Sequence, residues 1–155
     1  MEYTLTQAGE GLIAGESYRF RYRASNKLGW GPFSDIVSFA AASIPDQASP
    51  VTTQIENKVV KFAWDYPNDG AAPILEYSIQ IKTKDGQFVE ETVYCSGQQK
   101  AVILNNYCVI PLSTVLRQAP FNLEFKDPII ARVNSRNVIG WSTQYSLEST
   151  IYATV

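Results

Sequence analysis

The sequence contains no histidine, which removes the commonest general base and the commonest transition-metal ligand. Its charges nearly balance, with 13 basic and 15 acidic residues and a formal net charge of −2. The sequence therefore lacks the excess of positive charge that would indicate nucleic acid or an anionic membrane as a partner. No apolar run approaches the roughly 18 residues of a membrane-spanning helix, so we expect no membrane insertion by this segment.

Acidic residues offer little for catalysis or metal binding. The only close acidic pairs are Glu90 with Glu91 and Asp65 with Asp69. A glycosidase needs two carboxylates about 5–10 Å apart in a cleft, and nothing around these pairs indicates burial. No Asp-x-Asp-x-Asp calcium loop is present. We therefore predict a protein that is not an enzyme and that has no cofactor and no metal site.

The two cysteines, Cys95 and Cys108, are too few for a zinc site built from this chain alone. They lie about a dozen residues apart with strand-like sequence on both sides, which favours a disulfide across a hairpin or loop. Such a bridge would add roughly 3 kcal/mol in the chain-entropy model and would indicate an oxidising compartment. The alternative is a pair of reduced cysteines buried as small apolar side chains.

A five-residue pattern, Asn-x-x-Gly-Trp, occurs at residues 26–30 and again at residues 137–141, 111 positions later. Enough chain precedes the second copy for a whole β-sandwich, whereas only 25 residues precede the first. The spacing therefore predicts one complete repeat and the last part of another.

Short strands dominate the hydrophobic pattern. Residues 18–23 alternate aromatic side chains with arginines, which is typical of a half-buried antiparallel strand, and residues 129–133 occupy the same place before the second copy. Between the copies, strands are expected at residues 59–64, 74–83, 88–94, 101–104 and 107–112. Because no stretch has sustained helical periodicity, we predict an all-β sandwich.

Residues 44–50 form the expected boundary between two domains. They contain Pro45 and Pro50, which restrict the backbone, so the segment is predicted to be a short and stiff linker. The first domain is then residues 1–43 and the second is residues 51–155.

The second domain contains a tryptophan followed by the pattern Pro-x-x-Gly-x-x-Pro-Ile-x-x-Tyr. Its main positions are Trp64, Pro73, Ile74 and Tyr77. This pattern resembles the core signature of the fibronectin type III family, within the immunoglobulin-like β-sandwich superfamily. The second-half signature of that family is similar to residues of the first domain, namely Leu12, Gly15, Tyr18, Phe20, Tyr22, Ala24, Asn26, Gly29 and Ser34.

The resemblance implies antiparallel β-sandwiches, one complete and one partial, in tandem within a large extracellular or surface protein. Tyr18 stands at the tyrosine-corner position, where the hydroxyl bonds to nearby backbone. Two positions depart from the family pattern: Ile129 replaces the corner tyrosine in the second domain, and Ala71 replaces one glycine of a Gly-Gly pair.

Residues 1–43 supply only the last strands of such a sandwich. Tyr18, Phe20, Tyr22 and Phe39 then lack the other half of a core and become candidates for assembly contacts. Three explanations are open. The chain is a piece of a longer tandem array, a neighbouring chain supplies the missing strands, or residues 1–43 pack irregularly on the second domain.

The repeated tryptophans, Trp30 and Trp141, are further contact candidates, for sugar stacking or for subunit contacts, since tryptophan is enriched in interface hot spots. The alternative is that each ring covers its own hairpin. A set of arginines, Arg19, Arg21, Arg23, Arg132 and Arg136, suggests a stripe for acidic polysaccharide. The simpler interpretation, which we favour, is a solvated face paired with acidic neighbours.

Together these features predict a non-enzymatic structural or adhesive module of an extracellular fibre, filament or cell-surface coat. Its expected partners are copies of itself or neighbouring repeats, joined head to tail, with other surface or matrix proteins as further candidates. The alternative is a receptor or cell-adhesion ectodomain fragment that binds a protein ligand through its loops.

Overall fold

The structure, a computed structural model, describes residues 11–155 and divides into two units, Met1–Ser43 and Ile44–Val155. The first ten residues of the predicted partial domain lie outside the described residues. In both units the paired strands run antiparallel. We describe each unit by itself.

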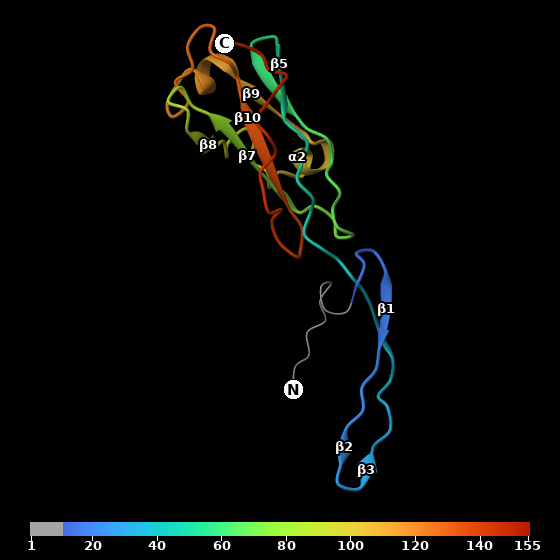
Figure 1. The fold of residues 1–155 in the computed structure, drawn as a ribbon. Helices are drawn as coiled ribbons and strands as arrows, with labels where there is room; N and C mark the ends of the chain where they lie inside the picture. The colour runs from blue at the N-terminus through green and yellow to red at the C-terminus, as the bar shows by residue number, and fades with distance from the viewer. Residues whose placement is uncertain (1–10) are drawn as a thin grey trace. The chain divides into compact units, whose positions relative to one another are not determined.

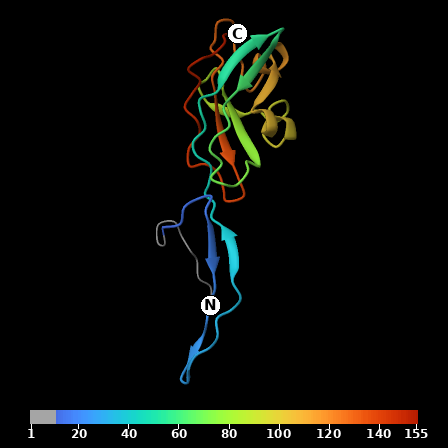
Figure 2. The same ribbon diagram turned by 90° about the vertical axis from the view of Figure 1, so that its right-hand side faces the viewer.

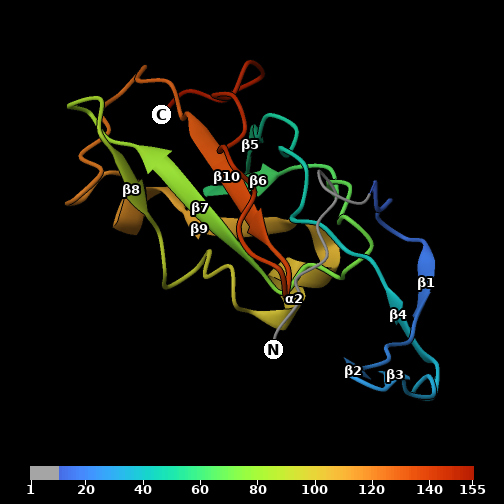
Figure 3. The same ribbon diagram turned by 60° about the horizontal axis from the view of Figure 1, so that its bottom comes forward.

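The second unit is a sandwich of two antiparallel three-stranded sheets (Figures 1 and 3). One sheet has the strand order β5-β6-β9, and the other has the order β10-β7-β8. The strands are β5 (Thr52–Glu56), β6 (Val59–Ala63), β7 (Glu76–Lys82), β8 (Phe88–Glu90), β9 (Tyr107–Pro111) and β10 (Ala131–Arg136). This is the predicted immunoglobulin-like, all-β fold.

The core of the second unit lies between its two sheets, because alternate side chains of each strand point inward. The fully buried members come from four strands and include Val60, Phe62, Ile79, Ile81, Ile110 and Val133. A fully buried side chain of this kind contributes about 1.5–3 kcal/mol relative to an exposed one. This apolar layer holds the second unit together.

Two segments predicted as strand differ in the structure. Residues 101–104 lie in a short helix, α2 (Lys100–Asn105), which buries only Val102 and ends where Asn106 takes a left-handed conformation with φ of 56°. The predicted strand 88–94 ends at Glu90, because the side chain of Glu91 bonds to the backbone that follows it. A short π-helical segment, η1 (Leu112–Leu116), follows β9 and buries Leu116.

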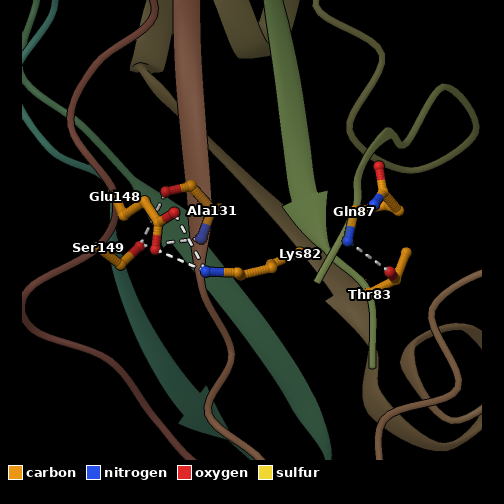
Figure 4. A network of polar contacts seen from close by, with 6 residues as sticks. All are labelled: Lys82, Thr83, Gln87, Ala131, Glu148 and Ser149. Atoms are coloured by element: carbon orange, nitrogen blue, oxygen red, sulfur yellow. Dashed lines mark hydrogen bonds and ion pairs between the residues drawn. The ribbon is translucent and has the colours of Figure 1, made fainter. Parts of the chain in front are cut away.

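The C-terminal segment secures β10 on the side away from β7. The hydroxyl of Ser149 donates to the carbonyl of Ala131 at 3.2 Å and accepts the amide of the same residue at 3.1 Å (Figure 4). Beside it, Lys82 pairs with Glu148 at 2.9 Å across the same face. Strand β10 is therefore supported on both edges.

Residues 44–50, the predicted linker, make several contacts with the rest of the second unit. The amide of Asp46 donates to the carbonyl of Asn68 at 2.9 Å, and the side-chain amide of Gln47 donates to the carbonyl of Tyr145 at 2.7 Å. Ala48 is buried. The segment is thus held on the surface of the second unit.

The described part of the first unit is a long hairpin. Strands β1 (Ser17–Phe20) and β4 (Val37–Ala40) pair antiparallel with Tyr18 opposite Phe39, and they run side by side in Figure 2. The two-residue strands β2 (Ser25–Asn26) and β3 (Gly29–Trp30) pair at its tip.

The repeated Asn-x-x-Gly-Trp pattern has a local physical reason. The side-chain oxygen of Asn26 accepts the amide of Leu28 at 2.8 Å, and that of Asn137 accepts the amide of Ile139 at the same distance. In such a turn the side-chain oxygen of asparagine accepts the backbone amide of the second residue after it, and the chain reverses direction. Gly29 has φ of 128°, which disfavours residues with a side chain. The pattern therefore marks one turn made twice.

Candidate functional site

One face of the hairpin in the first unit carries an uncovered row of aromatic side chains. Tyr18, Phe20 and Tyr22 alternate along the strand, and the ring of Tyr18 stacks on Phe39 with centroids 6.1 Å apart. Phe20 is 41% exposed and Tyr22 is 68% exposed. We call Tyr18, Phe20, Tyr22 and Phe39 the aromatic face.

The equivalent positions of the second unit are completely covered. The offset of 111 residues places Ile129, Ala131 and Val133 where the first unit has Tyr18, Phe20 and Tyr22. Each of these three residues of the second unit has a relative exposure of 0%. The same position in the repeat is therefore core in one unit and surface in the other.

The strand edges differ in the same way. Strand β10 pairs with β7 along all six of its residues, from Ala131 opposite Ile81 to Arg136 opposite Glu76. Strand β1 pairs with β4, and no described residue pairs with its other edge. Within residues 11–155, this edge of β1 therefore has no partner strand beside the apolar face.

The tyrosine corner of the first unit is formed locally. The hydroxyl of Tyr18 accepts the backbone amide of Ile13 at 2.8 Å. In the second unit Ile129 cannot make this bond; its amide instead donates to the carbonyl of Ala153 at 2.9 Å. The hairpin is thus shaped by its own residues.

The opposite face of the hairpin carries arginines stacked on aromatic rings. The guanidinium of Arg21 lies 3.9 Å from the centroid of Phe33, and that of Arg23 lies 4.4 Å from the centroid of Trp30. In the second unit Arg132, the repeat equivalent of Arg21, lies 4.1 Å from Phe88 and 4.5 Å from Tyr145.

The expectation of a solvated arginine face paired with acids therefore holds only in part. Arg136 does pair with the carboxylate of Glu76 at 3.0 Å. Arg21, Arg23 and Arg132 instead lie against aromatic rings, where cation–π attraction is worth about 0.5–1 kcal/mol at exposed sites.

The repeated tryptophans both reach solvent. Trp30 is 64% exposed at the tip of the hairpin, beside Leu28, which is 97% exposed. Trp141 is 39% exposed, and the guanidinium of Arg136 lies 5.7 Å from its ring centroid. Both rings thus have free surface, and their contact role stays a prediction.

The disulfide favoured by the cysteine spacing is present. Cys95 and Cys108 are bonded with their Cα atoms 5.2 Å apart, and both are buried. The bridge ties the loop after β8 to β9, and so it links the two sheets of the second unit.

Glu91 organises the same loop and corrects an expectation from the sequence, because this member of the Glu90–Glu91 pair is buried. Its buried carboxylate accepts the amides of Val93 at 3.0 Å, Tyr94 at 2.8 Å and Cys95 at 2.6 Å. The only sequence signal was an acidic residue a few positions before a cysteine, which is too weak to predict burial.

The signature residues Trp64, Ile74 and Tyr77 lie in the core, whereas Pro73 is exposed. The rings of Trp64 and Tyr77 meet edge to face with centroids 5.1 Å apart. Burial raises the pKa of Tyr77 to about 12, and its hydroxyl donates to the side chain of Asn106 at 2.9 Å. These residues are structural.

Within residues 11–155, no group of acidic or cysteine side chains is arranged to hold a metal ion. No helix in that part of the chain is both long and apolar enough to cross a bilayer. Two exposed features stand out among the described residues, namely the aromatic face and the tryptophans Trp30 and Trp141.

No protein-family model matches the chain, but curated proteins are similar to it over most of its length. Human host cell factor 2 is 28% identical over 149 residues, covering 90% of this chain and 18% of that protein. Human fibronectin type-III domain-containing protein 3A is 27% identical over 119 residues, covering 72% of this chain and 10% of that protein. The chain thus spans less than a fifth of the length of these relatives.

Among solved structures, chicken CNTN1 FN1-FN3 domains match with a TM-score of 0.50 and 17% identity, covering 92% of this chain and 45% of that one. At this identity the match supports the fold alone. It agrees with the signature residues and with the two antiparallel sheets described above. The second unit of this chain therefore has the β-sandwich fold of fibronectin type III domains.

Proposed function

We propose that the chain is a non-enzymatic structural and adhesive module whose aromatic face is covered by strands from another polypeptide segment. The supplied segment would carry the first half of the same fold, including a tryptophan strand and a Pro-Ile-x-x-Tyr strand. The observation that carries the proposal is the contrast between Tyr22, which is 68% exposed, and its repeat equivalent Val133, which is 0% exposed.

The second unit indicates which strand the partner must supply. There β7, which follows Pro73 and Ile74, pairs along the edge of β10. The free edge of β1 is the equivalent place in the first unit. An incoming β7-like strand would gain backbone hydrogen bonds at that edge, as in other cases of strand addition.

Covering the aromatic face gives this association its driving force. Each large apolar side chain taken from water contributes about 1.5–3 kcal/mol, before the cost of association. Phe20, Tyr22 and Val37 all have exposed surface to lose. The interaction therefore has both an apolar component and a directional, hydrogen-bonded one.

Completion of this kind favours assembly into filaments. The hairpin face and the strands that cover it are different surfaces, so the contact is heterologous and does not close on itself by symmetry. If a neighbouring chain supplies the strands, each chain joins the next head to tail. If an adjoining segment supplies them, the result is a rod of tandem sandwiches.

The disulfide supports an extracellular or cell-surface location, because such bonds persist in oxidising compartments. In that location the chain would have neighbouring repeats, copies of the same protein, or other surface or matrix proteins as its partners. The chicken structure comprises FN1-FN3 domains, and a repeat array is consistent with this similarity.

A second candidate function is that of a receptor or cell-adhesion ectodomain that binds a protein ligand through a loop. The tip of the hairpin favours it, since Leu28 is 97% exposed and Trp30 is 64% exposed. Tryptophan is common among interface hot spots. This function predicts a saturable complex with the ligand that a Trp30→Ala change weakens.

Electron microscopy and sedimentation of the native material test the proposal. We expect elongated assemblies in which Tyr22 is inaccessible to solvent, and a Tyr22→Ser change should dissociate them. A matched control is Leu147→Ser, which alters another exposed apolar side chain, 67% exposed, on the second unit. Discrete monomers with an exposed, folded hairpin would contradict the proposal.

Mixing two differently labelled populations separates the two sources of strands. Exchange of label into one assembly indicates strands from a neighbouring chain. Tyr22 buried in particles that contain a single chain indicates an adjoining segment of the same polypeptide. Both outcomes support coverage of the aromatic face. Tyr22 that is accessible to solvent both in mixed assemblies and in single-chain particles contradicts the proposed coverage.

A further inference from the structure

A groove of about 690 Å³ lies on the second unit, on the outer face of the sheet β10-β7-β8. Its floor is formed by Ser78 of β7 and Asn134 of β10, which stand opposite each other in the strand register. The loop that carries Cys95 flanks it on the β8 side, and Trp141 and Tyr145 flank it beyond β10. Its volume falls within the range of about 300–1,000 Å³ that is typical of sites for small ligands.

We propose that this groove binds a neutral saccharide. An aromatic ring, one free carboxylate and several hydroxyl and amide groups meet there, and this is the chemistry that a polyhydroxylated ring with an apolar C–H face requires. The inference does not rest on the proposed function, because every residue that it uses lies between positions 76 and 145.

Trp141 supplies the aromatic surface. Its ring is 39% exposed and lies at one side of the groove, next to Arg136. An indole is a large and rigid contact surface that loses little conformational freedom on binding. The C–H face of a sugar ring would pack against it.

The polar groups around the ring are held in place before any ligand arrives. The hydroxyl of Tyr145 bonds to Ser78 at 3.0 Å and to the side chain of Gln80 at 2.9 Å, and its ring lies against Arg132. Glu76 accepts bonds from Arg136 at 3.0 Å and from Gln98 at 3.3 Å. A preorganised set of this kind lowers the cost of binding.

Other polar groups of the groove are free to bond to a ligand. The carboxylate of Glu90, an exposed residue, has no hydrogen bond or ion pair within residues 11–155, and the hydroxyls of Thr92 and Ser96 have none in the same part of the chain. A carboxylate accepts hydrogen bonds only, whereas a hydroxyl both donates and accepts. Together they can satisfy neighbouring hydroxyls of a sugar.

The charges of the groove favour a neutral ligand over an ionic one. Glu90 repels an anion. A cation would meet the guanidinium of Arg136, which already lies 5.7 Å from the ring of Trp141 and neutralises Glu76. The aromatic surface is therefore unattractive to a lysine or arginine side chain.

The test is a titration of the full chain, labelled with nitrogen-15, against four defined saccharides: lactose, maltose, cellobiose and N,N′-diacetylchitobiose. With at least one of them we expect saturable amide shifts at millimolar concentration, confined to the groove. Trp141→Ala should weaken this binding about tenfold or more, and Glu90→Gln about threefold to tenfold. Trp141→Phe keeps an aromatic ring and should retain part of the affinity.

Two variants outside the groove are matched controls. Tyr107→Ala removes an aromatic ring that is 39% exposed on the other sheet, and Glu56→Gln changes an exposed carboxylate of the same sheet; both should bind as the parent does. The proposal is overturned if none of the four saccharides gives saturable groove shifts, or if Glu90→Gln and Trp141→Phe bind unchanged. It is also overturned if a trilysine peptide alone occupies the groove.

Discussion

Residues 18–22 and 129–133 hold the same position in the repeat but lie in opposite environments. In the second unit Ala131 and Val133 have relative exposures of 0%, while their equivalents Phe20 and Tyr22 are 41% and 68% exposed. Because the alternation of side chains is the same, the difference comes from what covers the strand and not from the strand itself. The alternation of side chains along a strand therefore indicates which face is apolar, and the segment packed against that face determines whether it is buried.

The largest expected effect comes from the same substitution made in the two units. Phe62→Ala in the core should lower the free energy of unfolding by about 3–5 kcal/mol, because it leaves a cavity. Phe20→Ala in the isolated chain should change it by less than about 1 kcal/mol, since this ring is already partly in solvent. Urea unfolding monitored by circular dichroism measures both. Equal losses would show that Phe20 is already covered.

Removing the disulfide should come next in size and should act on the second unit alone. The double change Cys95→Ala and Cys108→Ala opens a link between the two sheets, at a cost of about 3 kcal/mol. Amide spectra of residues 15–40 should be unchanged, because the hairpin has no such bridge. A shift in those amides, or no loss of stability, would argue against this assignment.

Replacing Glu91 tests why the loop after β8 keeps its shape. Glu91→Gln weakens an acceptor of three backbone amides, and we expect a loss of about 1–3 kcal/mol. Glu90→Gln, next to it but exposed, should stay within about 0.5 kcal/mol. Thermal unfolding of the pair gives the difference, and similar melting temperatures would refute it.

The smallest effect is expected at the repeated asparagine. Asn137 is 1% exposed; it bonds to the amides of Ile139 and Gly140 and donates to the carbonyl of Asp69 at 2.8 Å, whereas Asn26 is exposed and bonds to Leu28. We expect Asn137→Ala to cost about 1–2 kcal/mol and Asn26→Ala a few tenths. Chemical denaturation of both variants measures the loss in the free energy of unfolding. A larger loss at Asn137 means that burial contributes more to stability than the turn, and equal losses would contradict this.

Much of this fold follows from local sequence. The alternation at residues 18–23, the strands β6 and β7 and the Asn-x-x-Gly-Trp turns depend on neighbours in the chain, so the pattern predicts them. The disulfide could be favoured from spacing, because its two cysteines lie close in sequence.

Other features depend on contacts that spacing does not encode. Residues 101–104 have the apolar composition of a strand, but Val102 is their only buried side chain. A short helix can bury this one side chain. Arg132 of β10 lies between Phe88 and Tyr145, and Phe88 is distant from it in the sequence. Likewise, the sequence pattern marks Tyr77, Glu90 and Trp141 for separate reasons and does not join them into one groove, because its members meet only when Tyr145 reaches over β10 to Ser78.

Hydrogen exchange at the amides of Phe20 and Tyr22 tests the central claim most directly, with Ala131 and Val133 as internal references. In the isolated chain we predict rapid exchange at the first pair and slow exchange at the second. In the native assembled material both pairs should exchange slowly, because supplied strands cover the aromatic face. Rapid exchange of Phe20 and Tyr22 in the native material would contradict the account.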